Sequence, residues 1–348
     1  MLRAAVLGAG YMGSAITFPL AENGHRVHLW GTWLDDELLD GAREGKHPRL
    51  GKPLPQGVRT FYSRELEEAV QDADVVCIAV TSDGFLPVFE KLLGAVDKLP
   101  PVFGLTKGFV EREGSILSIS ESAAQLFSER FGGQRLQWVS IGGPVKAVEL
   151  ANRIPTATVF GYADPGVTRF FTEFATSYYR VFSVGDIPGV ELSSALKNVY
   201  AIGMGICDGF YEQRGIVDYH NFKAFIFNQA VREMALFIGE DQGKRDTVFD
   251  LAGVGDLYVT SASGRNGIFG RRIGMGGNPA QEYRVMRDAG EVAEGYHTLA
   301  LFVRFMEQRG NGLPGKLPLL SAIYRILYRG GSPRDELLAF NRLSGGAG

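Results

Sequence analysis

The chain has 348 residues, a formal net charge of −3 and 45% hydrophobic residues. This length exceeds the size at which a single hydrophobic core usually keeps growing, so it predicts two domains. The nearly balanced charge, without a long run of Lys or Arg, argues against nucleic acid and anionic membranes as partners. Cys77 and Cys207 lie in apolar segments without CxxC or Cys/His clustering, which is typical of packed thiols in a reducing compartment.

The start of the chain runs at once into the segment Arg3-Ala-Ala-Val-Leu7, which leaves no room for the regions of a signal peptide. No apolar run has the length that crosses a membrane. We therefore expect a cytoplasmic protein without membrane insertion. The five histidines show no metal-ligand spacing, so no metal site is expected.

The first half of the chain alternates short apolar runs with helix-length segments. Such alternation predicts an α/β fold with a mostly parallel sheet and helices on both faces. The predicted strands are residues 4–7, 26–30, 58–61, 74–80, 102–105, 137–141, 156–160 and 180–184. The predicted helices between them include residues 11–23, 64–71, 84–93 and 114–127, and one that opens at 163–166.

After the sequence Gly-Asp-Ile-Pro-Gly at 185–189, the pattern changes to helical periods almost throughout. We place a domain boundary there, between an α/β domain over residues 1–187 and an all-α domain over residues 188–343. The low-complexity tail, residues 344–348, is expected to be frayed.

A glycine motif, Gly8-Ala-Gly10-Tyr-Met-Gly13, follows the first predicted strand and opens a helix. GxGxxG alone is a weak signal in a chain with 46 glycines. Its context strengthens it, because the next strand ends at Trp30, where a Rossmann fold recognises the ribose. Gly8 permits the tight turn, Gly10 the approach of a pyrophosphate, and Gly13 the packing of helix on strand. The helix N-terminus adds N–H groups for the phosphates, so the first domain is predicted to bind a dinucleotide.

The tip of the second strand, Trp30-Gly-Thr32-Trp, carries no acidic residue. NAD specificity usually relies on a carboxylate there, which also repels the 2′-phosphate of NADP. Its absence favours NADP slightly over NAD, with Thr32 able to donate a hydrogen bond. The tip has no arginine that would add support for NADP.

Two further segments follow predicted strands of the same sheet, Thr106-Lys107-Gly108 and residues 142–147. Ligands of open α/β sheets bind beyond the carboxyl ends of the strands, so these loops and the glycine loop predict one cleft. Lys107 could steady a developing oxyanion. The alternative is an exposed loop lysine.

Lys197 is the one lysine in a helical run of small and apolar residues, 191–207. Its helical neighbours three and four positions away are Ser193, Ser194, Tyr200 and Ala201. Because none of these neighbours is a carboxylate that could pair with it, a desolvated lysine here has a lowered pKa and suits a general base. The alternative is a lysine that snorkels from the helix edge. Asp256, between glycines and apolar residues, needs a partner, and we assign Lys197 to it.

Two other segments of the second domain carry polar groups in unusual settings. Gly264-Arg265-Asn266-Gly267 offers a guanidinium and an amide in a predicted turn, a pair suited to a phosphate or a carboxylate. The alternative is an ordinary Asn-Gly turn with a surface arginine. The segment 291–295, Glu-Val-Ala-Glu-Gly, is acidic and is not explained by periodicity.

Together these motifs resemble NAD(P)-dependent glycerol-3-phosphate dehydrogenases, and the archaeal-type branch in particular. The matching motifs are Gly8-Ala-Gly10-x-x-Gly13, Leu29-Trp30, His47-Pro48 with Leu54-Pro55, Thr106-Lys107-Gly108, Gly143-Pro144, Ser194-Ala-Leu-Lys-Asn-Val199, Gly255-Asp256-Leu257, Arg265-Asn266 and Val292-Ala-Glu294-Gly295.

The resemblance implies a Rossmann-type domain followed by an all-α domain of the 6-phosphogluconate dehydrogenase type, a phosphorylated small-molecule substrate and a homodimer. It implies that Lys197 is the proton acceptor, that Lys107 contacts cofactor and substrate, and that Asp256 supports the base. The implied substrate-binding residues are Lys107, Gly143, Lys197, Asp256, Gly264, Arg265 and Asn266. The implied cofactor-binding residues are Gly8, Gly10, Tyr11, Met12, Gly13, Thr32, Lys107, Ala147, Arg265, Val292 and Glu294.

The chain departs from the bacterial pattern of this family at three places. Val145 stands where a hydroxyl residue is usual, Gly264 replaces a serine, and the arginine after the second strand is replaced around Thr32. Two hydroxyl groups for the substrate and a common contact for NADP are therefore missing.

The resemblance implies reversible reduction of dihydroxyacetone phosphate to sn-glycerol 3-phosphate, which would supply the backbone of phospholipids. One alternative is a dehydrogenase of another small hydroxy acid, as in the 6-phosphogluconate and hydroxyisobutyrate dehydrogenase groups, because Arg265 can hold a carboxylate equally well. Another is a non-catalytic NADP-binding sensor in which Val145 and Gly264 mark a lost substrate site.

Overall fold

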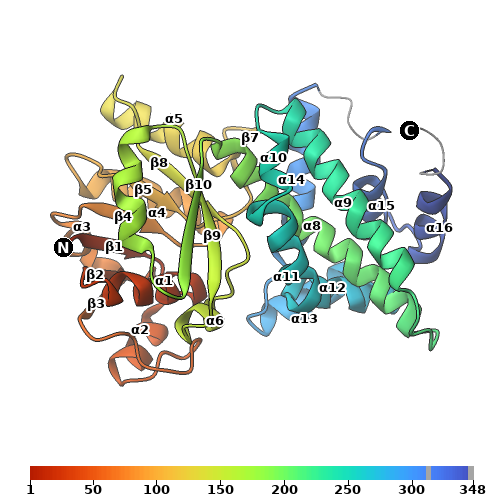
Figure 1. Cartoon of the computed structure of the whole chain (residues 1–348), viewed down its shortest axis with the longest axis horizontal. Helices are drawn as coiled ribbons and strands as arrows, with labels where there is room; N and C mark the ends of the chain where they lie inside the picture. Colours follow the sequence, from red (N-terminus) through yellow and green to blue (C-terminus); the bar gives the residue numbers. More distant parts are fainter. Residues whose placement is uncertain (311–314, 344–348) are drawn as a thin grey trace. The chain divides into compact units, whose positions relative to one another are not determined.

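The computed structural model describes residues 1–310 and 315–343 and divides into two compact units (Figure 1). The α/β unit contains Met1–Val110 and Leu117–Glu191, and the helical unit contains Glu111–Ile116 and the chain from Leu192 onward. The predicted tail, residues 344–348, lies outside the described residues.

The α/β unit is built on an eight-stranded sheet with the order β10-β9-β8-β5-β4-β1-β2-β3. Its strands are β1 (Arg3–Leu7), β2 (Arg26–Trp30), β3 (Val58–Phe61), β4 (Val75–Ile78), β5 (Val102–Gly104), β8 (Trp138–Gly142), β9 (Thr156–Tyr162) and β10 (Tyr179–Val184). Neighbouring strands are parallel except β8 and β9, which are antiparallel. The predicted strands and the mostly parallel sheet are therefore confirmed.

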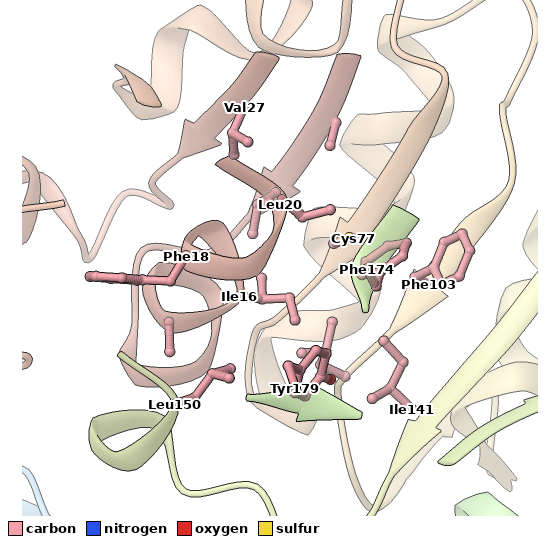
Figure 2. Close-up of a cluster of buried hydrophobic side chains, with 14 of the residues drawn as sticks. Ile16, Phe18, Leu20, Val27, Cys77, Phe103, Ile141, Leu150, Phe174 and Tyr179 are labelled. Atoms are coloured by element: carbon pink, nitrogen blue, oxygen red, sulfur yellow. The ribbon is translucent and has the colours of Figure 1, made fainter. Parts of the chain in front are cut away.

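The strands of this sheet are buried on both faces because their alternate side chains enter two separate cores. On β1, Ala4 and Val6 join one core, whereas Ala5 and Leu7 join the other. The first core is covered by α1 (Tyr11–Glu22), α6 (Ala147–Ala151) and α7 (Phe171–Phe174). Figure 2 shows this core, in which Ile16 and Leu20 of α1 lie near strand residues such as Cys77. Burial on both sides explains why these strands read as continuous apolar runs.

The opposite face of the sheet is covered by α3 (Leu66–Val70), α4 (Ser82–Ala95) and α5 (Ile119–Phe131). The helices predicted at 11–23, 64–71 and 84–93 are confirmed with small shifts at their ends. A short 3-10 helix, Pro165–Phe170, opens at the predicted place, where Asp164 Oδ1 accepts a hydrogen bond from Gly166 N at 2.8 Å. The helix α2 (Asp36–Arg43) was not predicted.

The predicted helix at 114–127 is wrong over its first residues. Strands β6 (Phe109–Arg112) and β7 (Ser115–Ser118) form a two-stranded sheet there. The turn between them has left-handed backbone angles, with φ of 52° at Glu113 and 81° at Gly114, which a helix cannot contain. Helix α5 begins only after Ser118, which forms a capping box with Glu121.

The helical unit is confirmed as almost entirely α-helical over its described residues. Its helices are α8 (Ile187–Glu212, which starts in the α/β unit), α9 (His220–Glu240), α10 (Arg245–Val248), α11 (Asp256–Ser263), α12 (Arg265–Gly274), α13 (Pro279–Asp288), α14 (Glu294–Gln308), α15 (Pro318–Tyr328) and α16 (Pro333–Leu343). In the described part of the chain, no helix is both long and apolar enough to cross a membrane.

Helices α8 and α12 approach each other so closely that glycine is required at their contact. A Cβ atom on Gly205 would lie 2.1 Å from the carbonyl oxygen of Gly267, and one on Gly270 would lie 2.1 Å from that of Ile202. Any larger residue would force the two helices apart. This contact fixes the first turn of α12 relative to the part of α8 that follows Lys197.

Candidate functional site

The loops that the sequence placed at one edge of the sheet do share that edge. Strands β1, β4, β5 and β8 run parallel in adjacent positions, so their carboxyl ends lie together. The glycine loop follows β1, Lys107 follows β5, and Gly143 follows β8. Strand β1 has β2 on one side and β4 on the other, which is the point where the order of an open sheet reverses and ligands bind.

The glycine loop has the geometry that a dinucleotide pyrophosphate requires. Gly8 has a φ of 108°, and a Cβ there would lie 2.8 Å from the carbonyl oxygen of Ala79. A Cβ on Gly13 would lie 1.8 Å from the carbonyl oxygen of Gly8, so α1 packs directly on the loop. Gly10 caps α1 without a side chain, which leaves the helix N-terminus open to an anion.

Arg49 is a residue near this loop that the sequence did not single out. Its Nη1 lies 3.1 Å from the position of a Cβ on Gly10, and its guanidinium carbon lies 5.6 Å from the centre of the Tyr11 ring. The side chain belongs to an exposed residue, so its positive charge faces solvent at the mouth of the loop. Its only signal in the sequence is its place directly after His47-Pro48.

The tip of β2 differs from the prediction in one respect. Asp35 is only 7% exposed, and its Oδ2 accepts hydrogen bonds from the backbone N of Thr32 at 2.9 Å and from its Oγ1 at 2.8 Å. The Thr32 hydroxyl therefore donates its proton to Asp35, contrary to the expectation that it is available to a ribose. The carboxylate of Asp35 therefore lies near the tip of β2, but it is buried and bonded to Thr32.

The other predicted groups at this edge lie in two loops. Lys107 is half-buried and is followed by Gly108, whose φ is 119°. Gly143 also has a left-handed φ, 113°, and a Cβ on it would lie 3.2 Å from Cα of Thr158. Ala147 is buried at the start of α6. These residues surround the same edge as the glycine loop.

In the helical unit, Lys197 has the partner that the sequence predicted. Its Nζ donates to Asp256 Oδ1 at 2.8 Å and to Thr260 Oγ1 at 2.6 Å. Thr260 Oγ1 lies 3.2 Å from the same oxygen of Asp256 and donates to it. The three residues are between 3% and 8% exposed. Thr260 was not predicted, although it lies one helical turn after Asp256, where the two side chains share a face.

Asp256 reaches this position because the helix around it is irregular. A π-helical turn, Leu251–Gly255, precedes α11, and a Cβ on Gly253 would lie 2.1 Å from the carbonyl oxygen of Val248. Such turns widen the helix locally and are frequent at functional sites. Asp256 then stands at the start of α11, with its carboxylate 2.8 Å from Lys197 Nζ.

A second network joins Asn198, the neighbour of Lys197, to the predicted Asn266. Asn266 Nδ2 donates to Asn198 Oδ1 at 2.9 Å, and Asn266 Oδ1 accepts from Gly295 N at 2.9 Å. Asn198 Nδ2 donates to Glu294 Oε2 at 3.4 Å. Asn198 lies inside a motif of the sequence but was not assigned a role there.

The predicted turn at 264–267 is wrong, because Arg265 and Asn266 form the first turn of α12. Gly264 caps this helix, and its N–H donates to the carbonyl oxygen of Thr260 at 3.0 Å. Arg265 Nη2 lies 3.6 Å from Oε1 of Glu294, which begins α14. Val292, half-exposed, lies just before that helix. The helical unit thus gathers the predicted groups from α8, α11, α12 and α14.

A cavity of about 620 Å³ in the α/β unit lies away from these groups. It is lined by Arg3, Arg26, His28 and Arg59 among others, and none of the predicted site residues lines it. Within residues 1–310 and 315–343, no group of three or more His, Cys, Asp or Glu side chains is arranged to hold a metal ion.

Comparison with known proteins finds one family over nearly the whole chain. The family description for the N-terminus of NAD-dependent glycerol-3-phosphate dehydrogenase matches residues 3–168, and that for its C-terminus matches residues 186–338.

An NADP(+)-dependent glycerol-3-phosphate dehydrogenase of Archaeoglobus fulgidus is 38% identical over 93% of this chain and 95% of its own length. A glycerol-3-phosphate dehydrogenase [NAD(P)+] of Carboxydothermus hydrogenoformans is 31% identical over 97% of this chain and 95% of its own. Among solved structures, glycerol-3-phosphate dehydrogenase from Coxiella burnetii superposes with a TM-score of 0.83 at 25% identity, covering 98% of both chains.

Proposed function

The chain belongs to the NAD-dependent glycerol-3-phosphate dehydrogenase family, and from this we propose that it interconverts dihydroxyacetone phosphate and sn-glycerol 3-phosphate with NAD(P). The observation that carries the proposal is the buried trio of Lys197, Asp256 and Thr260 in the unit that the family's C-terminal half matches. A buried lysine held by a carboxylate and a hydroxyl is suited to accept and return a proton.

The dinucleotide fits the edge of the sheet at the glycine loop. Gly8 and Gly13 allow the tight turn and the close packing of α1, Gly10 leaves space for the pyrophosphate at the N-terminus of α1, and Arg49 adds a positive charge beside it. The further cofactor-binding residues that we propose are Tyr11, Met12, Thr32, Lys107, Ala147, Arg265, Val292 and Glu294. When bound, the nicotinamide supplies the acceptor or donor of the hydride.

NADP is the cofactor that we favour slightly over NAD. The Archaeoglobus fulgidus relative is named as NADP(+)-dependent, which supports this choice. Thr32 donates its hydroxyl proton to Asp35, so its side chain can only accept a hydrogen bond from the cofactor.

Lys197 handles the proton of the reaction. In the oxidative direction, its neutral amine accepts the proton of the C2 hydroxyl while the C2 hydrogen leaves with its electron pair as hydride. In the reductive direction, its ammonium returns that proton to the oxygen on C2. Asp256 stabilises the ammonium form, and Thr260 accepts from Lys197 and donates to Asp256, which fixes the direction of the amine. Lys107 steadies the charge that develops on the oxygen.

The first turn of α12 is the group that we propose for the phosphate end of the substrate. Arg265 supplies a guanidinium, and the capping residue Gly264 leaves the N–H groups of the turn uncovered by a side chain. Asn266 holds Asn198 and Gly295 with its amide, so its main task is to fix this turn. We also propose Gly143, of the α/β unit, as a substrate-binding residue.

The experiment that tests the proposal follows the absorbance of NADPH and of NADH with dihydroxyacetone phosphate, and in separate assays with other 2-keto and 3-keto acids. Oxidation with dihydroxyacetone phosphate is the expected result. Oxidation only with a keto acid would favour the dehydrogenase of another hydroxy acid. Binding of NADPH without oxidation by any substrate would favour a sensor.

We also propose that the enzyme works in the cytoplasm as a homodimer and supplies glycerol phosphate for phospholipids. The turn after α8 exposes apolar residues, with Ile216 41% and Val217 73% exposed, beside the stacked rings of Tyr211 and Tyr219. A second copy of the chain could cover them. Light scattering of the wild type and of Val217→Asp tests this, because a dimer through this turn would dissociate in the variant.

A further inference from the structure

Both backbone polar groups of Ala9, between the first two glycines of the loop, are held by buried side chains from elsewhere in the chain. The N–H of Ala9 donates to Asp35 Oδ2 at 3.3 Å. Its carbonyl oxygen accepts from His47 Nε2 at 3.0 Å and from Ser14 Oγ at 3.1 Å. Ala9 and His47 are fully buried, and Asp35 is 7% exposed. Asp35 and His47 thus both hold the glycine loop at the backbone of Ala9.

The hydrogen bonds around His47 fix its form. Nε2 lies 2.9 Å from Ser14 Oγ as well as 3.0 Å from the carbonyl oxygen of Ala9, and because a carbonyl oxygen can only accept, the hydrogen bond to Ala9 requires the proton on Nε2. Nδ1 then accepts the N–H of Leu50 at 3.3 Å. A proton on Nδ1 as well would face the N–H of Leu50, so that two donors would meet. The neutral imidazole, with its proton on Nε2, is therefore the form that fits. Burial, the largest cause, lowers the pKa of His47 in agreement with this geometry.

Asp35 binds the glycine loop to the tip of β2. One oxygen, Oδ2, accepts from Ala9 N and from the N and Oγ1 of Thr32. The helix that follows Asp35 folds back closely, since a Cβ on Gly31 would lie 2.7 Å from Cδ1 of Leu39. The carboxylate therefore joins the two loops between which the ribose and pyrophosphate of a Rossmann dinucleotide lie.

A loop with glycine on both sides of Ala9 has many conformations when nothing restrains it. Binding a pyrophosphate would then require the loop to be ordered first, which weakens affinity. The two side chains do this ordering in advance. Because the Ala9 N–H is already used by Asp35, phosphate recognition is left to groups later in the loop.

We propose that Asp35 and His47 are positioning residues of the dinucleotide site, which set the affinity for NAD(P) by fixing the backbone of Ala9 and do not touch the substrate. This inference rests on the proposed function for the identity of the ligand. His47 belongs to a motif of the sequence, His47-Pro48, to which no task had been assigned.

The test compares Asp35→Ala, Asp35→Asn and His47→Ala in the full chain. The Kd for NADPH and for NADH is measured by the change in nicotinamide fluorescence, which needs no turnover, and kcat and KM are measured at saturating cofactor. We expect Kd and the cofactor KM to rise about tenfold in the two alanine variants, as for the loss of one hydrogen bond, with kcat nearly unchanged. Asp35→Asn keeps an acceptor oxygen, so it should recover part of the affinity.

His28→Ala is the matched control. His28 is also buried, 7% exposed, and its Nδ1 lies 2.9 Å from the carbonyl oxygen of Ala69, away from the glycine loop. The His28→Ala variant should lose thermal stability as His47→Ala does, but its Kd for the cofactor should not change. If an alanine variant does not fold, His47→Phe, which keeps a ring without a hydrogen-bonding nitrogen, and Asp35→Leu, which keeps the bulk without an acceptor, provide the same comparison.

An unchanged cofactor Kd in folded Asp35 and His47 variants would overturn the inference. So would a Kd that rises equally in His28→Ala, because the effect would then follow from general destabilisation. A wild-type protein that binds NADPH tightly but does not oxidise it with dihydroxyacetone phosphate would instead contradict the proposed function and leave the Kd comparison valid.

Discussion

The two units build their functional groups by opposite means. In the α/β unit, the edge of the sheet presents mainly backbone, and the side chains of Asp35 and His47 serve to hold that backbone. In the helical unit, the proposed proton acceptor Lys197 is a buried side chain, held by Asp256 and Thr260. We infer that the first region governs cofactor affinity and the second governs turnover, so substitutions in the two should separate Kd from kcat.

The largest effect is expected for Lys197→Ala. Loss of the proton acceptor should lower kcat by about a hundredfold to ten-thousandfold, with the Kd for NADPH nearly unchanged. Lys223→Ala is the matched control, because Lys223 also pairs with an aspartate of the same unit, Asp208, at 2.8 Å. Steady-state kinetics and fluorescence titration of both variants check this. Turnover of Lys197→Ala near that of Lys223→Ala would remove Lys197 from the mechanism.

A smaller effect of the same kind is expected for Thr260→Val. The variant keeps the shape of the side chain but removes the hydroxyl that Lys197 and Asp256 share. We expect kcat to fall about tenfold, the size of one hydrogen bond to a charged group, while both KM values stay close to normal. Thr260→Ser should restore most of the turnover. A change confined to the cofactor KM would break the proposed separation between the two regions.

Arg49→Gln tests the first region with a more modest effect. Removal of a solvent-facing charge beside Gly10 should raise the Kd for NADPH severalfold at low salt and less at high salt, since exposed charges are screened. Turnover at saturating NADPH should not change. Arg64→Gln, an exposed arginine that stacks on Tyr62 at 5.1 Å, is the control. A Kd that is independent of salt and equal in both variants would show that Arg49 does not meet the phosphates.

The smallest effect concerns stability against pH. Burial is the first cause that lowers the pKa of both His28 and His47 from the usual 6.5. Below that value the unfolded chain binds protons that the folded chain does not, so the free energy of unfolding falls as the pH drops. The contribution of these two histidines to stability is fully present at pH values above their pKa in the unfolded chain. It is lost as the pH falls toward their lower pKa in the folded chain.

Urea unfolding at about pH 7 and about pH 5.5 measures this change. The double variant His28→Gln, His47→Gln should lose less stability between the two values than the wild type does. The buried carboxyls of Glu191 and Glu233, whose pKa values burial raises, act in the opposite direction in both proteins. An identical loss in wild type and variant would contradict the lowered pKa of the two imidazoles.

Sequence patterns predicted the features that depend on neighbours in the chain or on the cost of burial. The glycine loop follows from local spacing, and the pair of Lys197 and Asp256 follows because neither charge is stable alone in an apolar setting. The hairpin of β6 and β7 was missed because its strands are short and its turn depends on a left-handed φ at Glu113.

The residues that sequence reasoning missed are those whose contacts join distant segments. Arg49 and His47 reach the glycine loop across a long stretch of chain, and no periodicity connects them to it. Asp35 was overlooked because it follows the strand tip by several residues and folds back on it. Asn198 follows Lys197 directly and Thr260 lies one helical turn after Asp256, but both look like ordinary polar positions on a helix.

The most direct test of the central claim is the identity of the product. The purified chain is incubated with dihydroxyacetone phosphate and NADPH, and the product is resolved by its stereochemistry. We predict sn-glycerol 3-phosphate in an amount equal to the NADPH consumed, with none formed by Lys197→Ala on the same time scale. Consumption of NADPH without sn-glycerol 3-phosphate, or equal product from Lys197→Ala, would contradict it.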